Sequence, residues 1–325
     1  MSEETVCAVL VTFNRKELLI ECLESLKNQS RPLDAIYVID NASTDGTINL
    51  LFKKKYINSI PPTDILEPYE AIYKGNKIPI HYIRMHKNIG GAGGFHEGLK
   101  RAYSAGYDWF WLMDDDGTPS HECLEKLLVN KQFFMAPIII NNKNHEKLSF
   151  PSYIFRNGKK LELITVDDAY KASEDKKTIP NFASPFNGTL ISKVLVEKIG
   201  YPRKEFFIWG DESEYLKRSQ LYGFNAVTFL DAHFFHPPNQ IKIKSPLKGL
   251  IGHSYFADDL KLYCFYRNNY HIIRDYDGYI SLLYVICTEI ARRIILNDLK
   301  GLKIVLSAWI DSFLNKWGKE RKFIK

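Results

Sequence analysis

Cysteine is scarce in this sequence of 325 residues, and no two cysteines have the CxxC spacing of a metal site. The chain has five, an odd number: Cys7, Cys22, Cys123, Cys264 and Cys287. A disulfide framework or a thiolate metal site needs paired, closely spaced cysteines. We therefore expect reduced thiols, which are typical of a cytoplasmic protein.

Long apolar runs are also missing. The longest apolar stretch, from Gly278 to Thr288, stops at Glu289, about half of the roughly 20 residues that a membrane-spanning helix needs. Glu3 and Glu4 stand near the N-terminus, where a signal peptide carries basic residues. We therefore expect no membrane span and no secretion signal.

A strong excess of one charge is absent as well. Lys and Arg number 44 against 38 for Asp and Glu, which leaves a net charge of +6 at pH 7. This is far below the basicity of a dedicated nucleic-acid-binding domain, so we expect no nucleic-acid partner. The 45% of hydrophobic residues can fill the core of a large α/β domain with a smaller appendage. The oligomeric state is left open.

What the sequence does contain is an alternation of apolar strand-like runs and amphipathic helix-like segments. We predict strands at 6–13, 35–40, 80–85, 109–113, 187–192 and 225–230. We predict helices at 15–28, 47–56, 97–104, 193–199 and 212–222. This alternation predicts βαβ units, a parallel sheet and ligands at the carboxyl ends of its strands. Segments 57–76 and 141–180 lose the pattern and are interpreted as surface insertions.

Beyond about residue 245 the sequence becomes aromatic and helical. Apolar residues from Ile280 to Phe313 recur at helical spacing, which predicts a C-terminal helical region. Arg and Lys side chains flank these apolar faces, which also contain Trp309 and Trp317. This pattern is typical of a helix that lies on an anionic lipid surface. A helical cap or a dimer interface is the alternative.

Three successive carboxylates, Asp114, Asp115 and Asp116, end the strand at 109–113. Packing like charges there is unfavourable unless a cation lies between them. Mg²⁺ and Mn²⁺ take oxygen ligands of this kind and keep positions for substrate phosphates. The triplet therefore predicts a metal–diphosphate site, with an acidic turn that caps the next helix as the alternative.

Two further motifs follow predicted strands. Asp40 ends the second strand, where an acid can accept hydrogen bonds from a base or ribose, although an Asx turn would also explain it. Glycines between Asn88 and Gly94 follow the third strand and let backbone approach a ligand. They do not form the dinucleotide fingerprint, and a glycine-rich turn without a ligand is the alternative.

An acidic cluster opens the helix predicted at 212–222. Asp211, Glu212 and Glu214 directly follow the aromatic segment 206–209. Acids in a first helical turn are favoured by the helix dipole, but apolar surroundings also raise a carboxylate pKa and suit a general base. His236 lies 24 positions after Glu212 and offers an imidazole ligand, or serves a structural role beside Phe234.

In this order the motifs resemble those of glycosyltransferase family 2, an inverting family with the GT-A fold. The matching stretches are 11–15, 38–47, 88–91 and 113–116, and the resemblance covers roughly residues 5–240. It implies a Rossmann-like, mostly parallel sheet flanked by helices. We expect a glycosyltransferase domain at 1–244, with a donor half at about 1–120 and an acceptor half at about 180–244. The helical region at 245–325 follows it.

The resemblance also implies roles for individual residues. It implies that a nucleotide-diphosphate-sugar donor contacts Thr12, Phe13, Arg15, Asp40, Asn88, Gly90, Gly91, Asp114 and Asp115. It implies that Mn²⁺ or Mg²⁺ binds to Asp114, Asp116 and His236. The general base is Glu212 or Asp211, and the acceptor contacts Trp209, Glu214, Arg267 and Asn268.

Within the family, segment 207–215 is most similar to galactofuranosyltransferases, whose matching stretch reads aromatic-Ile-Trp-Gly-Asp-Asp-x-Glu-Tyr. Glu212 stands at the usual catalytic Asp, so both acids stay open as the base. The element at 266–269 is shared with rhamnosyltransferases. We expect transfer from UDP-galactofuranose to a polysaccharide or lipid-linked glycan, at the inner face of the membrane. Transfer from dTDP-rhamnose, or non-catalytic binding of a sugar nucleotide, are the alternatives.

Overall fold

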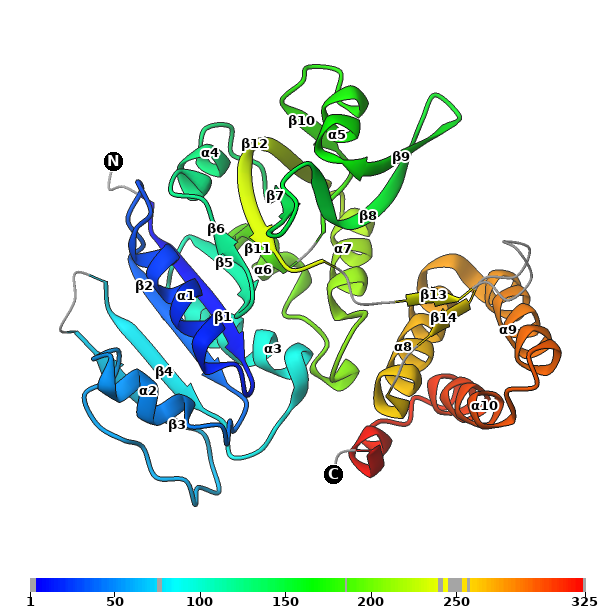
Figure 1. Ribbon diagram of the computed structural model, residues 1–325, viewed down its shortest axis with the longest axis horizontal. Coiled ribbons are helices and arrows are strands. Elements are labelled where there is room, and N and C mark those ends of the chain that lie inside the picture. Colours follow the sequence, from blue (N-terminus) through cyan, green and yellow to red (C-terminus); the bar gives the residue numbers. More distant parts are fainter. Residues whose placement is uncertain are drawn as a thin grey trace. The chain divides into compact units, whose positions relative to one another are not determined.

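The computed structural model describes residues 4–74, 78–184, 186–238, 242–244, 253–255 and 258–323. The chain divides into two compact units (Figure 1). The first contains residues 1–90, 94–201 and 218–239, and the second contains 91–93, 202–217 and 240–325. Residue 245, where the helical region was expected to begin, lies outside the described residues.

The first unit is built on a mixed sheet with the strand order β10-β12-β7-β11-β5-β1-β2-β4-β3. Four of the predicted strands form its parallel centre: β1 (Val6–Thr12), β2 (Ala35–Asp40), β4 (Ile80–Arg84) and β5 (Trp109–Asp114). Antiparallel pairing adds β3 (Tyr69–Tyr73) beside β4 and β11 (Asn187–Ser192) beside β5. The carboxyl ends of β1, β2 and β5 therefore meet at one edge, where the predicted donor residues stand.

The remaining strands form the other side of the sheet. β7 (Phe134–Asn141) runs parallel to β12 (Ala226–His236), which also pairs with β6 (Thr118–Pro119) and β10 (Thr178–Pro180). The pairing of β12 with β7 shifts between Phe229 and His233, so the residues between them form a bulge. β12 runs six residues further than the strand predicted to end at Leu230, and this extension carries His236.

Helices of the first unit follow its strands, among them α1 (Lys16–Lys27), α2 (Thr47–Lys53), α3 (Gly90–Ser104), α4 (Cys123–Leu128) and α6 (Lys193–Ile199). The apolar stripe expected on α1 comprised Leu18, Leu19, Cys22, Leu23 and Leu26. The last four have no exposed surface, whereas Leu18 is 37% exposed and lies off the buried face. The four buried side chains pack with the sheet residues Val6 and Val38 in one core cluster. The predicted alternation and the α/β fold class are confirmed.

Helix α3 begins earlier than predicted. The glycines at 90–94 were expected to form a turn before a helix at 97–104, but the helix starts at Gly90. A Cβ at Gly94 would lie 2.5 Å from Val11 Cγ1, and one at Gly98 would lie 2.4 Å from Val9 Cγ1. These two glycines therefore let the helix lie against β1, which outweighs their poor helix propensity.

Segment 141–180 is also more regular than predicted. It contains a hairpin of β8 (Lys147–Arg156) and β9 (Lys159–Thr165), followed by α5 (Val166–Ala172). Thr165 and Asp168 form a capping box at the start of α5. Leu148, Leu163 and Ala169 bury their side chains in a core cluster of this segment. The Asn157-Gly158 pair, a strong hairpin signal, was the overlooked cue.

The second unit is mainly helical, as predicted. It contains the first turns of α7 (Asp211–Leu221), preceded by the short helix η1 (Lys204–Phe206). Its C-terminal part contains α8 (Asp259–Ile272), the π-helical turn η2 (Ile273–Asp277), α9 (Gly278–Ile295), α10 (Leu299–Phe313) and η3 (Lys319–Phe323), with the short strands β13 (Lys242–Lys244) and β14 (His253–Tyr255). Tyr263, Tyr270, Leu282 and Val305 lie in its core. Among the described residues, no helix combines the length and apolarity needed to cross a bilayer.

Candidate active site

The acidic triplet lies where β5 ends, beside the end of β1. Thr12 is buried and its Oγ1 donates a hydrogen bond of 2.6 Å to Asp115 Oδ2. Arg15 Nη1 lies 3.1 Å from Asp115 Oδ1 and 2.6 Å from Asp116 Oδ2. The structure thus brings these predicted site residues together, with one guanidinium between two of the three carboxylates.

His236 joins this cluster from β12. Its Nε2 lies 3.0 Å from Asp116 Oδ1. Its Nδ1 lies 2.7 Å from the carbonyl oxygen of Pro237, so the Nδ1 proton is donated there and Nε2 faces the acid. A Cβ at Gly117 would lie 2.2 Å from Phe234 Cε1, so only glycine lets the acidic turn pack against β12. The pairing of β12 with β6, which follows the turn, holds the two segments together.

The electrostatics of the cluster show an excess of negative charge. Burial, and then repulsion by Asp116 and Asp115, raises the pKa of Asp114 to about 8. Burial raises the pKa of Asp115 to about 6, although the charge of Arg15 and the hydrogen bond from Thr12 act to lower this pKa. Burial acts to raise the pKa of Asp116, but the hydrogen bond and charge of His236 together with the charge of Arg15 outweigh burial and lower the Asp116 pKa. The same contact raises the pKa of His236 against the effect of burial.

A divalent cation fits this donor set, because carboxylates and imidazole are its usual ligands and their charge is not balanced by protein cations. The predicted ligands Asp116 and His236 are in contact, and Asp114 adjoins them in the chain. Within the part of the chain that the structure describes, no three His, Cys, Asp or Glu side chains already form a complete metal-binding group. Metal binding therefore remains a prediction.

Asp40 is fully buried at the end of β2, and its carboxylate is engaged by protein groups. Oδ1 accepts a hydrogen bond of 2.8 Å from Ser43 N, while Oδ2 interacts with the Tyr82 hydroxyl and lies 3.3 Å from Arg84 Nη1. Tyr82 and Arg84 had not been predicted. Register explains the contact, since Asp40 and Arg84 are paired residues of β2 and β4.

The glycine-rich segment is tied to the same strand ends. Asn88 Oδ1 accepts a hydrogen bond of 2.8 Å from Gly90 N and so forms an Asx turn at the entry to α3, whose N-cap residue is Ile89. Asn41, a buried residue that had not been predicted, donates from Nδ2 to Gly90 O at 3.0 Å. Asn41 Oδ1 is buried without a hydrogen-bond partner among the described residues. Phe13 is 41% exposed at the end of β1 and Gly91 is partly exposed, as a ligand contact requires.

The predicted bases belong to the second unit, at the start of α7. The Asp211 side chain is 4% exposed. Glu212 is half-buried, and no hydrogen bond or ion pair to its carboxylate is present among the described residues. Of the two acids, Glu212 is the more exposed residue.

The four residues predicted to contact the acceptor also lie in the second unit. Trp209 is half-buried, with Lys261 Nζ 5.6 Å from its ring centroid. Glu214 is fully buried, and its Oε1 accepts hydrogen bonds from Tyr276 at 2.6 Å and Arg203 at 3.2 Å. Arg267 and Asn268 are buried as well and bind main-chain carbonyl oxygens. Their contact with an acceptor remains a prediction.

Comparison with known proteins identifies the family of this chain. The model of glycosyl transferase family 2 matches residues 7–132. The galactofuranosyltransferase GlfT1 of Mycolicibacterium smegmatis is 30% identical over 278 residues, which are 83% of this chain and 83% of the relative. The GlfT1 of Mycobacterium tuberculosis is also 30% identical, over 83% of this chain and 82% of its own length. The chain belongs to glycosyltransferase family 2.

Solved structures agree with the fold of this glycosyltransferase. S. aureus TarS has a TM-score of 0.51 at 13% identity, over 95% of this chain and 80% of that chain. GalNAc-T7, solved with UDP, GalNAc and Mn²⁺, has a TM-score of 0.53 at 12% identity, over 83% of this chain and 48% of its own. These structures confirm the predicted GT-A fold. The glycosyltransferase class is confirmed by the family and its relatives.

Proposed function

We propose that this glycosyltransferase moves galactofuranose from UDP-galactofuranose to a hydroxyl of a polysaccharide or lipid-linked glycan. The observation that carries the proposal is the identity to two mycobacterial galactofuranosyltransferases over more than four fifths of each chain. Segment 207–215, which resembles galactofuranosyltransferases in sequence, lies at the start of α7 and offers the accessible acid Glu212.

The reaction is a single displacement with inversion. The acceptor oxygen forms a bond to the anomeric carbon as the bond from that carbon to the diphosphate oxygen breaks, and UDP leaves with the bonding electrons. The acceptor proton passes to the carboxylate of Glu212. Its accessibility supports this choice over Asp211, whose side chain is 4% exposed, and general-base catalysis of this kind contributes roughly 10²- to 10⁴-fold.

Asp114, Asp116 and His236 would hold a Mn²⁺ or Mg²⁺ ion. A divalent cation bound there would neutralise the charge of the diphosphate leaving group. The raised pKa of Asp114, and the contact of Asp116 with His236, support this assignment. Thr12 and Arg15 orient Asp115 and Asp116 through the hydrogen bonds described above.

The remaining donor-binding and acceptor-binding residues are assigned from the resemblance to glycosyltransferase family 2. Phe13, Arg15, Asn88, Gly90 and Gly91 would line the nucleotide-sugar site, together with Asp40, Asp114 and Asp115. Trp209 would contact the acceptor through its half-buried ring.

We also propose peripheral association with an anionic membrane through α9 and α10, which suits a lipid-linked acceptor. Ile280 is 87% exposed and Tyr284 is 73% exposed on α9, and Phe313 on α10 is 55% exposed. Lys303 and Lys316 are exposed cations of the same helical region. Arg293 and Trp317 take no part, because Arg293 is buried with Glu289 and Trp317 stacks on Phe206.

The test of the donor compares UDP-galactofuranose with dTDP-rhamnose. The purified protein is given each donor with Mn²⁺ and a panel of bacterial polysaccharide acceptors, and product mass and anomeric configuration are determined. We expect a hexose in the five-membered furanose ring to be added from UDP-galactofuranose, with inverted configuration, and UDP to bind more tightly than dTDP in calorimetry. Transfer from dTDP-rhamnose alone would contradict the proposed donor.

A further inference from the structure

The backbone just before the two candidate bases has an uncommon conformation. Phe207 has φ 66° and ψ −63°, and Ile208 N donates a hydrogen bond of 2.8 Å to Phe206 O, which together define a γ-turn of the rare, strained kind. Trp209 follows with φ 61° and Gly210 with φ 88°. Positive φ at bulky aromatic residues is a genuine outlier, so other contacts must maintain this segment.

The side chain of Asn268, on α8, provides such contacts. Its Nδ2 lies 2.9 Å from the carbonyl oxygen of Phe206, 3.1 Å from that of Ile208 and 2.6 Å from that of Trp209. Asn268 is 1% exposed, so these carbonyl groups replace water as its partners. Its Oδ1 accepts a hydrogen bond of 3.0 Å from Arg267 Nε. This bond assigns the amide orientation, since the opposite one would place oxygen against three carbonyl oxygens.

Arg267 supports the same segment from the adjacent position. Its Nη2 donates to Phe206 O at 2.9 Å, and its Nη1 forms an ion pair with Glu320 at 2.5 Å. The guanidinium lies 4.8 Å from the centroid of the Trp317 ring and 5.3 Å from that of Tyr263, so aromatic rings and the Glu320 carboxylate both hold it. The Arg267 side chain has no exposed surface.

The clamped segment leads directly into the acids. Glu214 N donates to Gly210 O at 2.8 Å, so only Gly210 separates the start of α7 from Trp209, the last residue that Asn268 contacts. A Cβ at Gly210 would lie 3.1 Å from Asn268 Cβ, which shows how closely α8 approaches this point. Asn268 therefore holds the backbone that determines how Asp211 and Glu212 are oriented at the start of α7.

We propose that Asn268, supported by Arg267, is a positioning residue that holds the strained segment 206–210 and thereby orients the base on α7. This inference rests on the proposed function for the role of Glu212 or Asp211 as the base. The family resemblance implied that Arg267 and Asn268 contact the acceptor. The proposal instead assigns them a role that needs no contact with the acceptor.

The test compares Asn268→Ala with Asn268→Ser, which keeps one donor, and with the control Asn269→Ala. Asn269 is the next residue on α8 and makes no side-chain hydrogen bond among the described residues. Hydrogen–deuterium exchange is followed in peptides that cover 206–216, and kcat, donor KM and UDP affinity are measured on the full chain. A misplacement of about 1 Å can lower turnover about 10²-fold.

We expect Asn268→Ala to lower kcat about 10²-fold and to speed exchange at 206–216 about tenfold or more, with donor KM and UDP affinity changed less than about twofold. Asn268→Ser should have a kcat and an exchange rate between those of Asn268→Ala and the wild type. Asn269→Ala should match the wild type in both. Unchanged exchange at 206–216, or faster exchange with wild-type kcat, overturns the proposal. If Asn268→Ala does not fold, the same criteria are applied to Asn268→Ser.

The assay uses whichever nucleotide sugar the wild-type enzyme turns over. A wild-type enzyme that is inactive with UDP-galactofuranose but active with another donor therefore contradicts the proposed donor, and the comparison of the Asn268 variants still decides the positioning role.

Discussion

Nε2 of His236 lies 3.0 Å from Oδ1 of Asp116, although 120 positions separate the two residues in the chain. The contact joins the end of β12 to the turn after β5, and His236 Nδ1 is held by the Pro237 carbonyl oxygen. A divalent cation that took both side chains as ligands would displace a proton shared between them. Metal and proton therefore compete for this pair.

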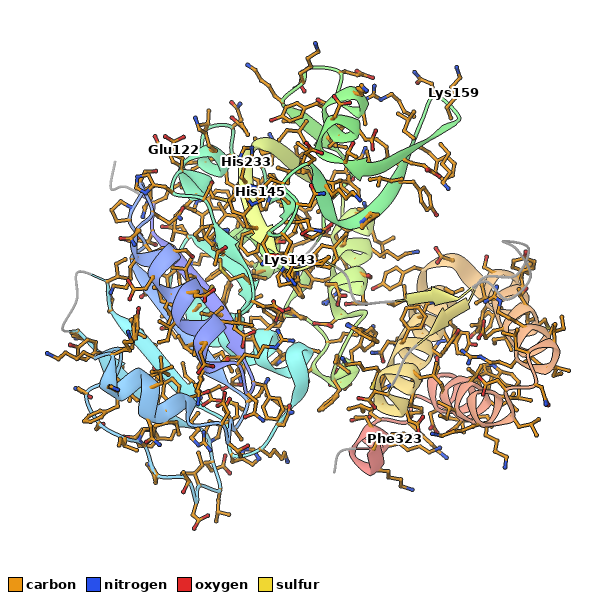
Figure 2. The ribbon with its side chains drawn as sticks, in the orientation of Figure 1. Glu122, Lys143, His145, Lys159, His233 and Phe323 are labelled. Carbon is orange, nitrogen blue, oxygen red and sulfur yellow. The ribbon has the colours of Figure 1, made fainter. Side chains whose placement is uncertain are left out.

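The first prediction concerns metal removal. Excess EDTA should abolish transfer, and added Mn²⁺ or Mg²⁺ should restore it. His236→Ala, which removes a proposed ligand, should raise the Mn²⁺ concentration needed for half-maximal activity by at least about 10- to 100-fold, the range for loss of an outer-shell partner. The matched control is His233→Ala, which removes a histidine from the same strand (Figure 2). Full turnover in EDTA would exclude a catalytic metal.

The second prediction separates the two candidate bases. Glu212→Gln should lower kcat by roughly 10²- to 10⁴-fold while UDP affinity is retained, because only proton removal is lost. Asp211→Asn should act mainly on acceptor KM. Glu205→Gln, which changes an exposed acid of the same unit, should have wild-type kinetics. Near-normal kcat in Glu212→Gln, together with its loss in Asp211→Asn, would reverse the roles.

The third prediction concerns pH and His271. Burial, reinforced by Arg274 and Arg203 and opposed by Asp275, lowers its pKa from 6.5 to about 4. The folded state thus binds fewer protons here than the unfolded state, so stability is present above pH 6.5 and is lost as pH falls toward 4. His271→Gln should flatten the pH dependence of the urea midpoint in this window. His145→Gln, an exposed histidine, should keep the wild-type slope.

The fourth prediction concerns the glycines of α3. Gly98→Ala should lower the free energy of unfolding by about 1–3 kcal/mol, because the new methyl group would lie 2.4 Å from Val9 Cγ1 and 2.9 Å from Ile39 Cγ1. Gly91→Ala is the matched change in the same helix, with no atom within 4 Å of the added Cβ. It should be neutral or stabilise by up to about 1 kcal/mol. Equal effects in urea unfolding would contradict the close helix–strand packing.

The fifth prediction tests the proposed membrane contact. Ile280→Asp should reduce cosedimentation with anionic liposomes at low salt, because it places a charge on the exposed apolar face of α9. Leu66→Asp makes the same change at a residue of the first unit that is 91% exposed, and it should leave cosedimentation unchanged. A wild-type protein that does not cosediment would favour a helical cap or a dimer interface.

Sequence patterns predicted the parallel central strands and the acidic turn well, because each depends on local runs of residues, but they missed β7 and the hairpin of β8 and β9. β2 and α6 have the predicted bounds. The partners of Asp40 could not be predicted, because Arg84 reaches it through the register of β2 on β4. The start of α3 was missed because glycine disfavours helices unless tertiary packing requires it. The γ-turn at Phe207 has no local signal, since aromatic residues normally avoid positive φ.

The number of residues in and after the bulge of β12 determines the face of the sheet on which His236 lies. Side chains of a strand alternate between its two faces, so parity decides which face each residue occupies. One residue inserted or deleted between Phe229 and His236 would turn the imidazole away from Asp116 even if every neighbour kept its identity. A change of length in this stretch therefore moves His236 even when no side chain is substituted. Among related sequences, a gap here would be a stronger sign of altered chemistry than a low identity.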